Sequence, residues 1–219
     1  MHRRKGRRGD QRRRPSSSSL FKFDLAYRQR YSQVAGIDEA GRGPLAGPVV
    51  AAAVILPNCR IPYLADSKLL TPDQRVDVYR LIQRHAYAIG VGMVAHDEID
   101  RINILQATYA AMRLALAQLM IRPSHLLVDG YPIPMSPYSQ TGIFGGDCKS
   151  ASIAAASIVA KVTRDCIMES WDREYPAYGF RQHKGYGTPG HLDVLIRLGP
   201  CAIHRRSFRP VRPALLEVS

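Results

Sequence analysis

Two adjacent carboxylates, Asp38 and Glu39, stand at the end of a short apolar run and lead directly into a glycine–arginine–glycine loop. Carboxylate oxygens are the ligands that Mg²⁺ and Mn²⁺ prefer in proteins. Gly41 and Gly43 carry no side chain, so the backbone on either side of Arg42 can approach a ligand closely. Metal-binding acids beside such a loop favour chemistry on a phosphodiester.

Two further acids extend this set. Asp129 ends a compact apolar segment, and Asp147 precedes a long stretch rich in Ala and Ser. Acids at strand ends can meet at one rim of a sheet, where α/β folds bind their ligands. Two divalent ions held there would activate a water and stabilise the leaving oxygen of a phosphodiester. Any one of these residues could instead be an ordinary cap or turn residue, Asp129 before Gly130 above all.

The spacing also limits which acids can act together. Neighbouring residues of a strand point to opposite faces, so Asp38 and Glu39 can share a metal site only if the strand ends by Glu39. Asp165 lies 18 residues beyond Asp147, and the span from Ser150 to Asp165 along a continuous helix is roughly 20 Å, too far for a shared metal pair. We therefore interpret Asp165, with Lys161 and Arg164, as charge on a helix surface.

The elements that must position these residues alternate along the chain. Apolar and β-branched runs predict strands at 34–38, 49–56, 87–95, 125–129 and 141–144. Apolar spacing and start signals predict helices at about 72–85, 103–121, 150–171 and 189–198, the first with Thr71 as its N-cap and Pro72 in its first turn. The alternation indicates an α/β or α+β domain in which helices cover a mixed sheet.

The chain of 219 residues has a formal net charge of +13, unevenly spread. Residues 1–14 hold eight Lys or Arg and one acid, a net charge of +7, which leaves +6 for the rest. We expect a basic, disordered arm over residues 1–33 and a folded catalytic domain over residues 34–219, with a start of the folded part near Leu20 as the alternative. This charge favours nucleic acid over a membrane as the partner, although a basic run can also serve solubility alone.

Several classes of protein are disfavoured. The four cysteines lack the Cys-x-x-Cys spacing of a zinc site and are typical of isolated thiols in a reducing cytosol. The longest apolar run, residues 49–56, is eight residues, less than half of a membrane span. The basic start is followed by serines and not by an apolar core, which argues against a signal peptide and favours a cytoplasmic protein.

Together these motifs give the chain a resemblance to bacterial ribonuclease HII, the type 2 ribonuclease H family. The matching segments run in the family's order and cover nearly all of residues 34–214: GIDEAGRGPLAGP at 36–48, DSKLL at 66–70, NILQAT at 103–108, LLVDG at 126–130, GDCKSASIAAASIVAKVTRD at 146–165, HKGYGT at 183–188 and HRRSF at 204–208. The chain departs from the usual pattern at Gly145, where a basic residue is common, and at Tyr131.

The resemblance implies a ribonuclease H-like α/β fold, with a mixed five-stranded sheet flanked by helices. It implies that Asp38, Glu39, Asp129 and Asp147 are the catalytic acids and bind Mg²⁺ or Mn²⁺. The loop of Gly41, Arg42 and Gly43 would contact the ribose 2′-hydroxyl, the group that separates RNA from DNA. Tyr186, between two glycines, would sense the deoxyribose on the 3′ side of an RNA–DNA junction. Candidate phosphate contacts, which set register without reading sequence, are Lys68, Lys149, Lys161, Lys184 and Arg205.

The expected activity is that of an endoribonuclease acting as a monomer on RNA–DNA hybrids. By resemblance it would also cut 5′ of single ribonucleotides in duplex DNA, leaving 3′-hydroxyl and 5′-phosphate ends. One alternative is a non-catalytic basic protein that binds nucleic acid, although such a protein gains nothing from carboxylates beside phosphate. Another is a different metal nuclease of the same fold, such as a Holliday-junction resolvase, against which the Gly-Arg-Gly loop and the Tyr186 segment argue.

Overall fold

The computed structural model describes residues 17–58, 60–64 and 70–211. Its centre is a five-stranded sheet with the order β3-β2-β1-β4-β5. The strands are β1 (Val34–Ala40), β2 (Val49–Ile55), β3 (Ala88–Val94), β4 (His125–Asp129) and β5 (Gln140–Ile143). The first three are antiparallel neighbours, whereas β4 runs parallel to β1 and β5 parallel to β4. The mixed five-stranded sheet expected from the sequence is confirmed.

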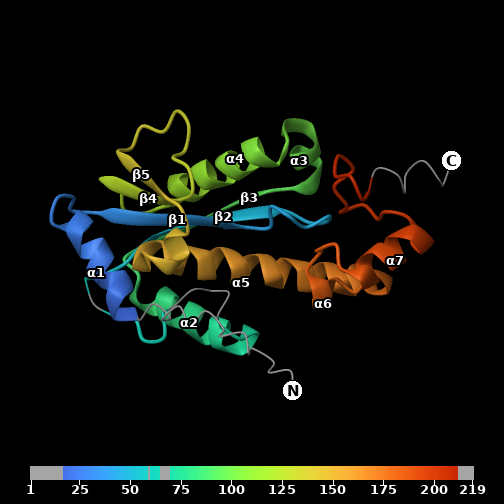
Figure 1. Ribbon diagram of the computed structural model, residues 1–219, viewed down its shortest axis with the longest axis horizontal. Helices are drawn as coiled ribbons and strands as arrows, with labels where there is room; N and C mark the ends of the chain where they lie inside the picture. The colour runs from blue at the N-terminus through green and yellow to red at the C-terminus, as the bar shows by residue number, and fades with distance from the viewer. Residues whose placement is uncertain (1–16, 59, 65–69, 212–219) are drawn as a thin grey trace, which may run out of the picture.

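Helices cover both faces of this sheet (Figure 1). They are α1 (Ser17–Arg28), α2 (Pro72–His85), α3 (His96–Ile102), α4 (Ile104–Ala117), α5 (Ala151–Glu174), α6 (Phe180–His183) and α7 (Pro189–Leu198), with short 3₁₀ turns at Gly146–Cys148 and Pro176–Tyr178. One core cluster joins the sheet to α4, and a second joins its other face to α2 and α5. The expected helices are present, whereas α1, α3 and α6 were not predicted.

Local signals set where these helices begin. Thr71 caps α2 in a capping box: its hydroxyl accepts from the Gln74 N–H while the Gln74 side chain accepts from the Thr71 N–H. Ser150 caps α5 and accepts from the Ile153 N–H. The Ala- and Ser-rich first half of α5 lies so close to β1 that a Cβ at Gly36 would stand 2.0 Å from the Ser152 carbonyl carbon. Small residues thus bring α5 against the strand that carries Asp38.

Helix α1 corrects the prediction of a disordered arm over residues 1–33. Residues 17–28 form a helix in which Leu20 and Asp24 are fully buried. The Asp24 carboxylate accepts from both the backbone N–H and the hydroxyl of Ser152, and so contributes to capping α5. Residues 1–16, the basic run included, lie outside the described residues.

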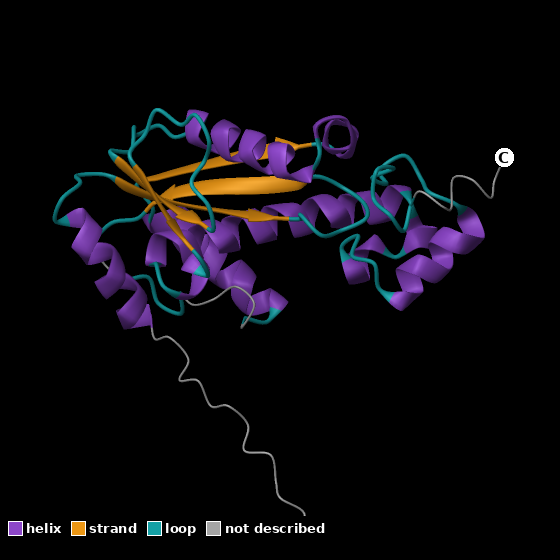
Figure 2. Ribbon diagram, turned by 45° about the horizontal axis from the view of Figure 1, so that its top comes forward, coloured by secondary structure: helices purple, strands orange, loops and turns teal. Residues whose placement is uncertain are grey.

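The second half of α5 extends past the sheet, where α6 packs beside it and α7 lies further from the sheet (Figures 1 and 2). This region brings residues 183–188 next to the loop that follows β1, because the Leu45 N–H donates to the Gly185 carbonyl. None of the helices in the described part of the chain is long and apolar enough to cross a membrane.

Candidate active site

Two acids are neighbours at the sheet rim because β1 and β4 are parallel and in register. The last paired residues are Ile37 and Val128, so Asp38 and Asp129 follow side by side where the parallel pairing ends. Both side chains, with that of Glu39, border a cavity of about 300 Å³. The structure therefore brings three of the four predicted acids to one cavity.

Asp38 is the most buried of these three, with 5 % of its surface exposed. Its Oδ1 accepts from the Glu39 N–H at 2.7 Å. Burial raises the pKa of Asp38 well above its ordinary value, and the charges of Glu39 and Asp129 raise it further. A hydrogen bond from Ser157 on α5 acts in the opposite direction. A cation bound among these three carboxylates would offset their mutual repulsion, so the arrangement favours cation binding.

Glu39 borders the same cavity, although the strand does not end at this residue as expected. Strand β1 continues to Ala40, and Glu39 still pairs with Ala51, so the prediction that the strand ends by Glu39 is wrong. The Glu39 Oε1 lies 3.2 Å from the Arg42 Nη1. Burial raises the pKa of Glu39, while Arg42 opposes that rise. Arg42 therefore partly neutralises the negative charge of Glu39.

Asp147 lies within the 3₁₀ turn that precedes α5. It is 2 % exposed, and its side chain is not among the described residues that line the cavity. The turn is nevertheless attached to the cluster, because the Gly146 N–H donates to the Asp129 Oδ1 at 2.6 Å. Asp147 is therefore adjacent to Asp129 through the backbone, and its predicted role as a ligand stays a prediction.

The donor set fits a hard divalent ion. Within the described ranges, no three acidic, His or Cys side chains stand close enough to form a complete ligand group. Mg²⁺ tolerates this, since it is usually held by one or two carboxylates and completes its shell with waters and substrate phosphates. Asp38, Glu39 and Asp129 supply carboxylate oxygens only, and no Cys, His or Met is among the described residues that line the cavity.

The Gly-Arg-Gly loop and Tyr186 border the same cavity as the acids. Gly41 has φ +97°, and a Cβ there would stand 2.1 Å from the Arg164 Nε, so only glycine fits. A Cβ at Gly43 would lie 3.8 Å from the Tyr186 ring. Tyr186 itself is 43 % exposed, with Lys161 Nζ 5.9 Å from its ring centroid. The two elements predicted to contact the sugar therefore lie next to each other in the cavity lining.

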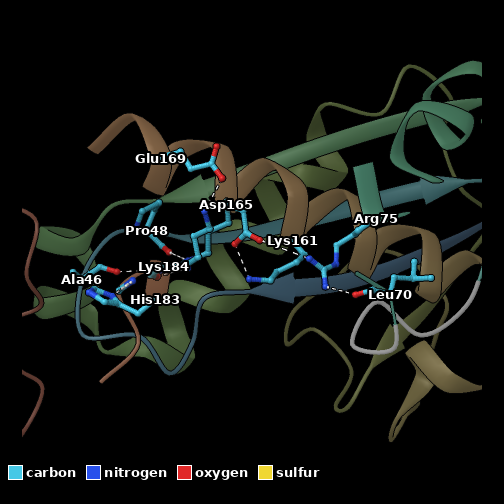
Figure 3. A network of polar contacts seen from close by, with 11 residues as sticks. Ala46, Pro48, Leu70, Arg75, Lys161, Asp165, Glu169, His183 and Lys184 are labelled. Carbon is cyan, nitrogen blue, oxygen red and sulfur yellow. Dashed lines mark hydrogen bonds and ion pairs between the residues drawn. The ribbon is translucent and has the colours of Figure 1, made fainter. Parts of the chain in front are cut away.

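Lys161 is the predicted phosphate contact that the cavity includes. Its Nζ lies 2.6 Å from Asp165, which also pairs with Arg75 of α2 at 3.9 Å; Figure 3 shows Asp165 between the two cations. Burial lowers the pKa of Lys161, and Asp165 opposes that shift. Asp165 thus orients cations at the edge of the cavity.

The other lysines lie outside that lining. Lys184 Nζ pairs with Glu169 at 2.6 Å. Lys149 Nζ donates to the Phe144 carbonyl, next to Gly145, the position where the family often has a basic residue. Gly145 has φ +62° with open space where a side chain would stand. Lys68 lies outside the described residues.

Arg205 requires a correction, because its side chain is fully buried and cannot reach a phosphate. Its three guanidinium nitrogens donate to the backbone carbonyls of Gly41, Arg42 and Gly47. Arg164 is likewise 1 % exposed, and so is not helix-surface charge as expected. The sequence reasoning also missed Ser157 and Arg75, which line the cavity.

A mixed sheet that carries acids at its rim beside a cavity of about 300 Å³ defines the class: a metal-dependent nuclease with a ribonuclease H-like fold. The chain belongs to the ribonuclease HII family, whose model matches residues 35–211. It is 58 % identical over 194 residues to ribonuclease HII of Geobacter sulfurreducens, covering 88 % of this chain and 89 % of that protein. It is 56 % identical over 190 residues to ribonuclease HII of Geobacillus thermodenitrificans, covering 86 % and 73 %. Membership of this family makes the chain an endoribonuclease of the ribonuclease H type.

Solved structures agree with the fold. Ribonuclease H2 of Pyrococcus horikoshii superposes with a TM-score of 0.71 at 28 % identity, covering 84 % of this chain and 98 % of that chain. Ribonuclease HII of Archaeoglobus fulgidus, solved in complex with PCNA, gives 0.65 at 26 % identity, with coverages of 81 % and 95 %. A Bst-RNase HIII solved with Mn²⁺ gives 0.61 at 17 % identity, with coverages of 85 % and 70 %, a likeness of fold alone.

Proposed function

We propose that this enzyme hydrolyses the RNA strand of RNA–DNA hybrids and also cuts on the 5′ side of single ribonucleotides embedded in duplex DNA. The products would carry 3′-hydroxyl and 5′-phosphate ends. The observation that carries this proposal is one cavity bordered by three carboxylates, by the Gly41–Gly43 loop and by Tyr186. Acids that suit metal ions and groups that suit a sugar are then within reach of the same phosphodiester.

The proposed mechanism uses Mg²⁺ or Mn²⁺. Asp38 and Asp129 would anchor the ions, Glu39 would hold one ion or its water, and Asp147 would complete the second position. When bound, two such ions supply an activated water and stabilise the leaving oxygen of an in-line displacement. The raised pKa of Asp38 supports the assignment, since a buried acid among acids is stabilised by a cation.

Recognition is assigned to the groups around the acids. The loop at Gly41, Arg42 and Gly43 would contact the ribose 2′-hydroxyl, and Tyr186 would pack on the deoxyribose that follows it. Lys161 is the best placed phosphate contact, because it lines the cavity. Lys149 and Lys184 are weaker candidates, because they are not among the described residues that line the cavity. Lys68 stays a candidate outside the described residues.

We further infer that the protein acts as a monomer in the cytoplasm. The acids, the loop and Tyr186 that border the cavity all come from one chain, so the site needs no second copy. The cytoplasm is inferred from the cysteines, whose spacing is typical of isolated thiols in a reducing compartment.

Replacing Asp129 by Asn tests the catalytic assignment. Asn keeps an oxygen for the Gly146 N–H but loses the charge that would hold a divalent ion. We expect cleavage of a labelled RNA–DNA hybrid in Mg²⁺ or Mn²⁺ to fall by about a thousandfold or more, since metal-ion stabilisation amounts to several kcal/mol. Affinity for the hybrid, measured by fluorescence anisotropy, should stay within about threefold.

Asp193→Asn on α7 is the matched control, because Asp193 is exposed and pairs with Arg197 instead of lining the cavity. It should cleave as the wild type does. Retained turnover by Asp129→Asn would contradict the role of Asp129. Wild-type binding without any metal-dependent cleavage would favour the non-catalytic alternative, and cleavage of branched DNA in preference to hybrids would favour the resolvase alternative.

A further inference from the structure

Arg205 and Arg164 form a buried pair of cations at the base of the Gly-Arg-Gly loop. Their guanidinium groups donate to six backbone carbonyls: those of Gly41, Arg42 and Gly47 from Arg205, and those of Ala46, Pro48 and Lys184 from Arg164. The N···O distances run from 2.6 to 3.0 Å. Arg205 also lies 5.1 Å from the Phe208 ring centroid. Charge-assisted bonds of this number hold a backbone far more firmly than a neutral turn does.

The position of these carbonyls decides where the loop's amide groups point. In a trans peptide, the carbonyl of one residue and the N–H of the next point in opposite directions. Because Arg205 binds the carbonyls of Gly41 and Arg42, the N–H groups of Arg42 and Gly43 point away from the buried guanidinium. Both residues line the cavity. Neither N–H donates to another group within the described residues.

The same two arginines connect the loop to Tyr186. Arg164 bonds the carbonyl of Lys184, two residues before Tyr186, as well as the carbonyls of Ala46 and Pro48, which are drawn in Figure 3. The backbone adds two ties, since the Leu45 N–H donates to the Gly185 carbonyl and the Arg205 N–H to the Leu45 carbonyl. These hydrogen bonds therefore hold the Gly-Arg-Gly loop and the Tyr186 segment in a fixed arrangement relative to each other.

We propose that Arg205 is a positioning residue for ribose recognition: it holds the Gly41 and Arg42 carbonyls inward so that the Arg42 and Gly43 N–H groups are presented, preformed, to the substrate's 2′-hydroxyl oxygen. Arg164 fixes the distance between these donors and Tyr186. This inference rests on the proposed function and adds to it the group that aims the loop. A lysine cannot replace Arg205, because one ammonium lacks the planar fork that reaches three carbonyls.

The test compares Arg205→Lys with Arg206→Lys, its exposed neighbour, which has no contact with the loop carbonyls among the described residues. Two duplexes of one sequence are used, one all-DNA and one with a single ribonucleotide. We expect Arg205→Lys to lower kcat/KM on the ribonucleotide duplex about tenfold or more, the equivalent of one or two lost hydrogen bonds. Its affinity for the all-DNA duplex should stay within about twofold, and Arg206→Lys should leave both values unchanged.

The two readouts separate positioning from general damage. A merely structural defect would weaken both the affinity for all-DNA duplex and the cleavage, in which case the proposal is wrong. Full ribonucleotide cleavage by a folded Arg205→Lys would also overturn it. If that variant does not fold, the Gly43 amide is replaced by an ester, which removes one N–H and leaves Arg205 in place. The ester protein should show the same selective loss, and unchanged cleavage would refute the proposal.

The proposed function fails in a different way. If the wild type itself does not cut the ribonucleotide duplex, the function is wrong whatever Arg205 does. If the wild type cuts and every variant cuts equally well, only the role of Arg205 is wrong.

Discussion

Asp38 is held in its buried position at an electrostatic cost. Burial and the charges of Glu39 and Asp129 raise its pKa above the ordinary value of 3.8. A group whose folded pKa is raised binds its proton more tightly in the native state, so stability falls as the pH rises from 3.8 through the folded pKa. The cost grows across that pH range when no metal is bound. Catalytic residues often carry such a cost.

Replacing Asp38 by Asn should therefore stabilise the metal-free protein while it abolishes cleavage. Asn keeps the oxygen that accepts from the Glu39 N–H but removes the buried charge. We expect the free energy of unfolding in urea with EDTA at pH 7 to rise, since burial and the neighbouring acids disfavour the charged form that Asn removes. Asp193→Asn should change nothing, and an Asp38→Asn protein less stable than the wild type would contradict this account.

At the scale of elements, residues 178–204 contain a chain of histidines that supports the Tyr186 segment. The Cys201 N–H donates to the His204 Nδ1, so His204 carries its proton on Nε2 and donates to the His191 Nε2 at 3.1 Å. His191 must then donate from Nδ1 to the Tyr186 carbonyl at 2.9 Å. Both imidazoles are neutral in this arrangement, because a proton on either would place two donors face to face.

The histidine chain predicts a loss of stability in acid. Burial, and then the nearby His191, lower the pKa of His204 to about 4 from an ordinary 6.5. Its contribution is therefore complete above pH 6.5 and is lost as the pH falls toward 4. The loss is at most about 3 kcal/mol, from about 1.4 kcal/mol per pKa unit.

Urea unfolding of the wild type and of His204→Gln at several pH values measures this effect. The variant is expected to be less stable at pH 7.5 but to lose less stability on acidification. The difference between the two slopes cancels the contribution of the carboxylates, because their titration is common to both proteins. Parallel slopes would show that His204 does not titrate in this window.

Elements with strong local signals could be predicted from the sequence. The Thr71–Pro72 start of α2, the Ser150 start of α5 and the apolar run of β2 carry their own caps or patterning. Helix α1 carries no such signal, because its stability comes from Leu20 in the core and from Asp24 on the start of α5, more than a hundred residues away. The basic residues before it also have a composition that is typical of disordered segments, which favoured the prediction of a disordered arm.

The site was predictable where residue type alone decides chemistry. Asp38, Glu39 and Asp129 meet as expected, whereas burial of Arg164 and Arg205 depends on carbonyls from a distant loop. One signal could have revealed Arg164: it falls four residues after Ala160 and four before Met168, on the buried stripe of α5. Nothing comparable marks Arg205 within its basic motif.

At the scale of the whole molecule, the net charge is concentrated at the start of the sequence. Residues 1–14 carry +7 of the total +13. Such a run would release counterions on binding nucleic acid and make affinity steeply dependent on salt. Because α1 begins at Ser17 and Leu20 is buried, a truncation that tests the run must stop before this helix.

Deleting residues 1–14 should reduce the salt dependence of hybrid binding and leave the cleavage site unchanged. Each lost phosphate contact lowers the slope of log K against log salt by about 0.9 for B-form DNA. A full-length variant with the eight basic residues of 1–14 replaced by Gln should behave like the truncation. An unchanged slope in both proteins would limit the run to solubility.

The most direct test of the central claim is cleavage of a labelled DNA duplex that carries one ribonucleotide, in Mg²⁺, in Mn²⁺ and in EDTA. The acids, the loop and Tyr186 around one cavity predict a metal-dependent cut immediately 5′ of the ribonucleotide, with a 3′-hydroxyl end and no product in EDTA. Cleavage of a continuous hybrid without any cut at the single ribonucleotide would contradict the junction-reading role of the loop and Tyr186. Cleavage of neither substrate would contradict the catalytic account as a whole.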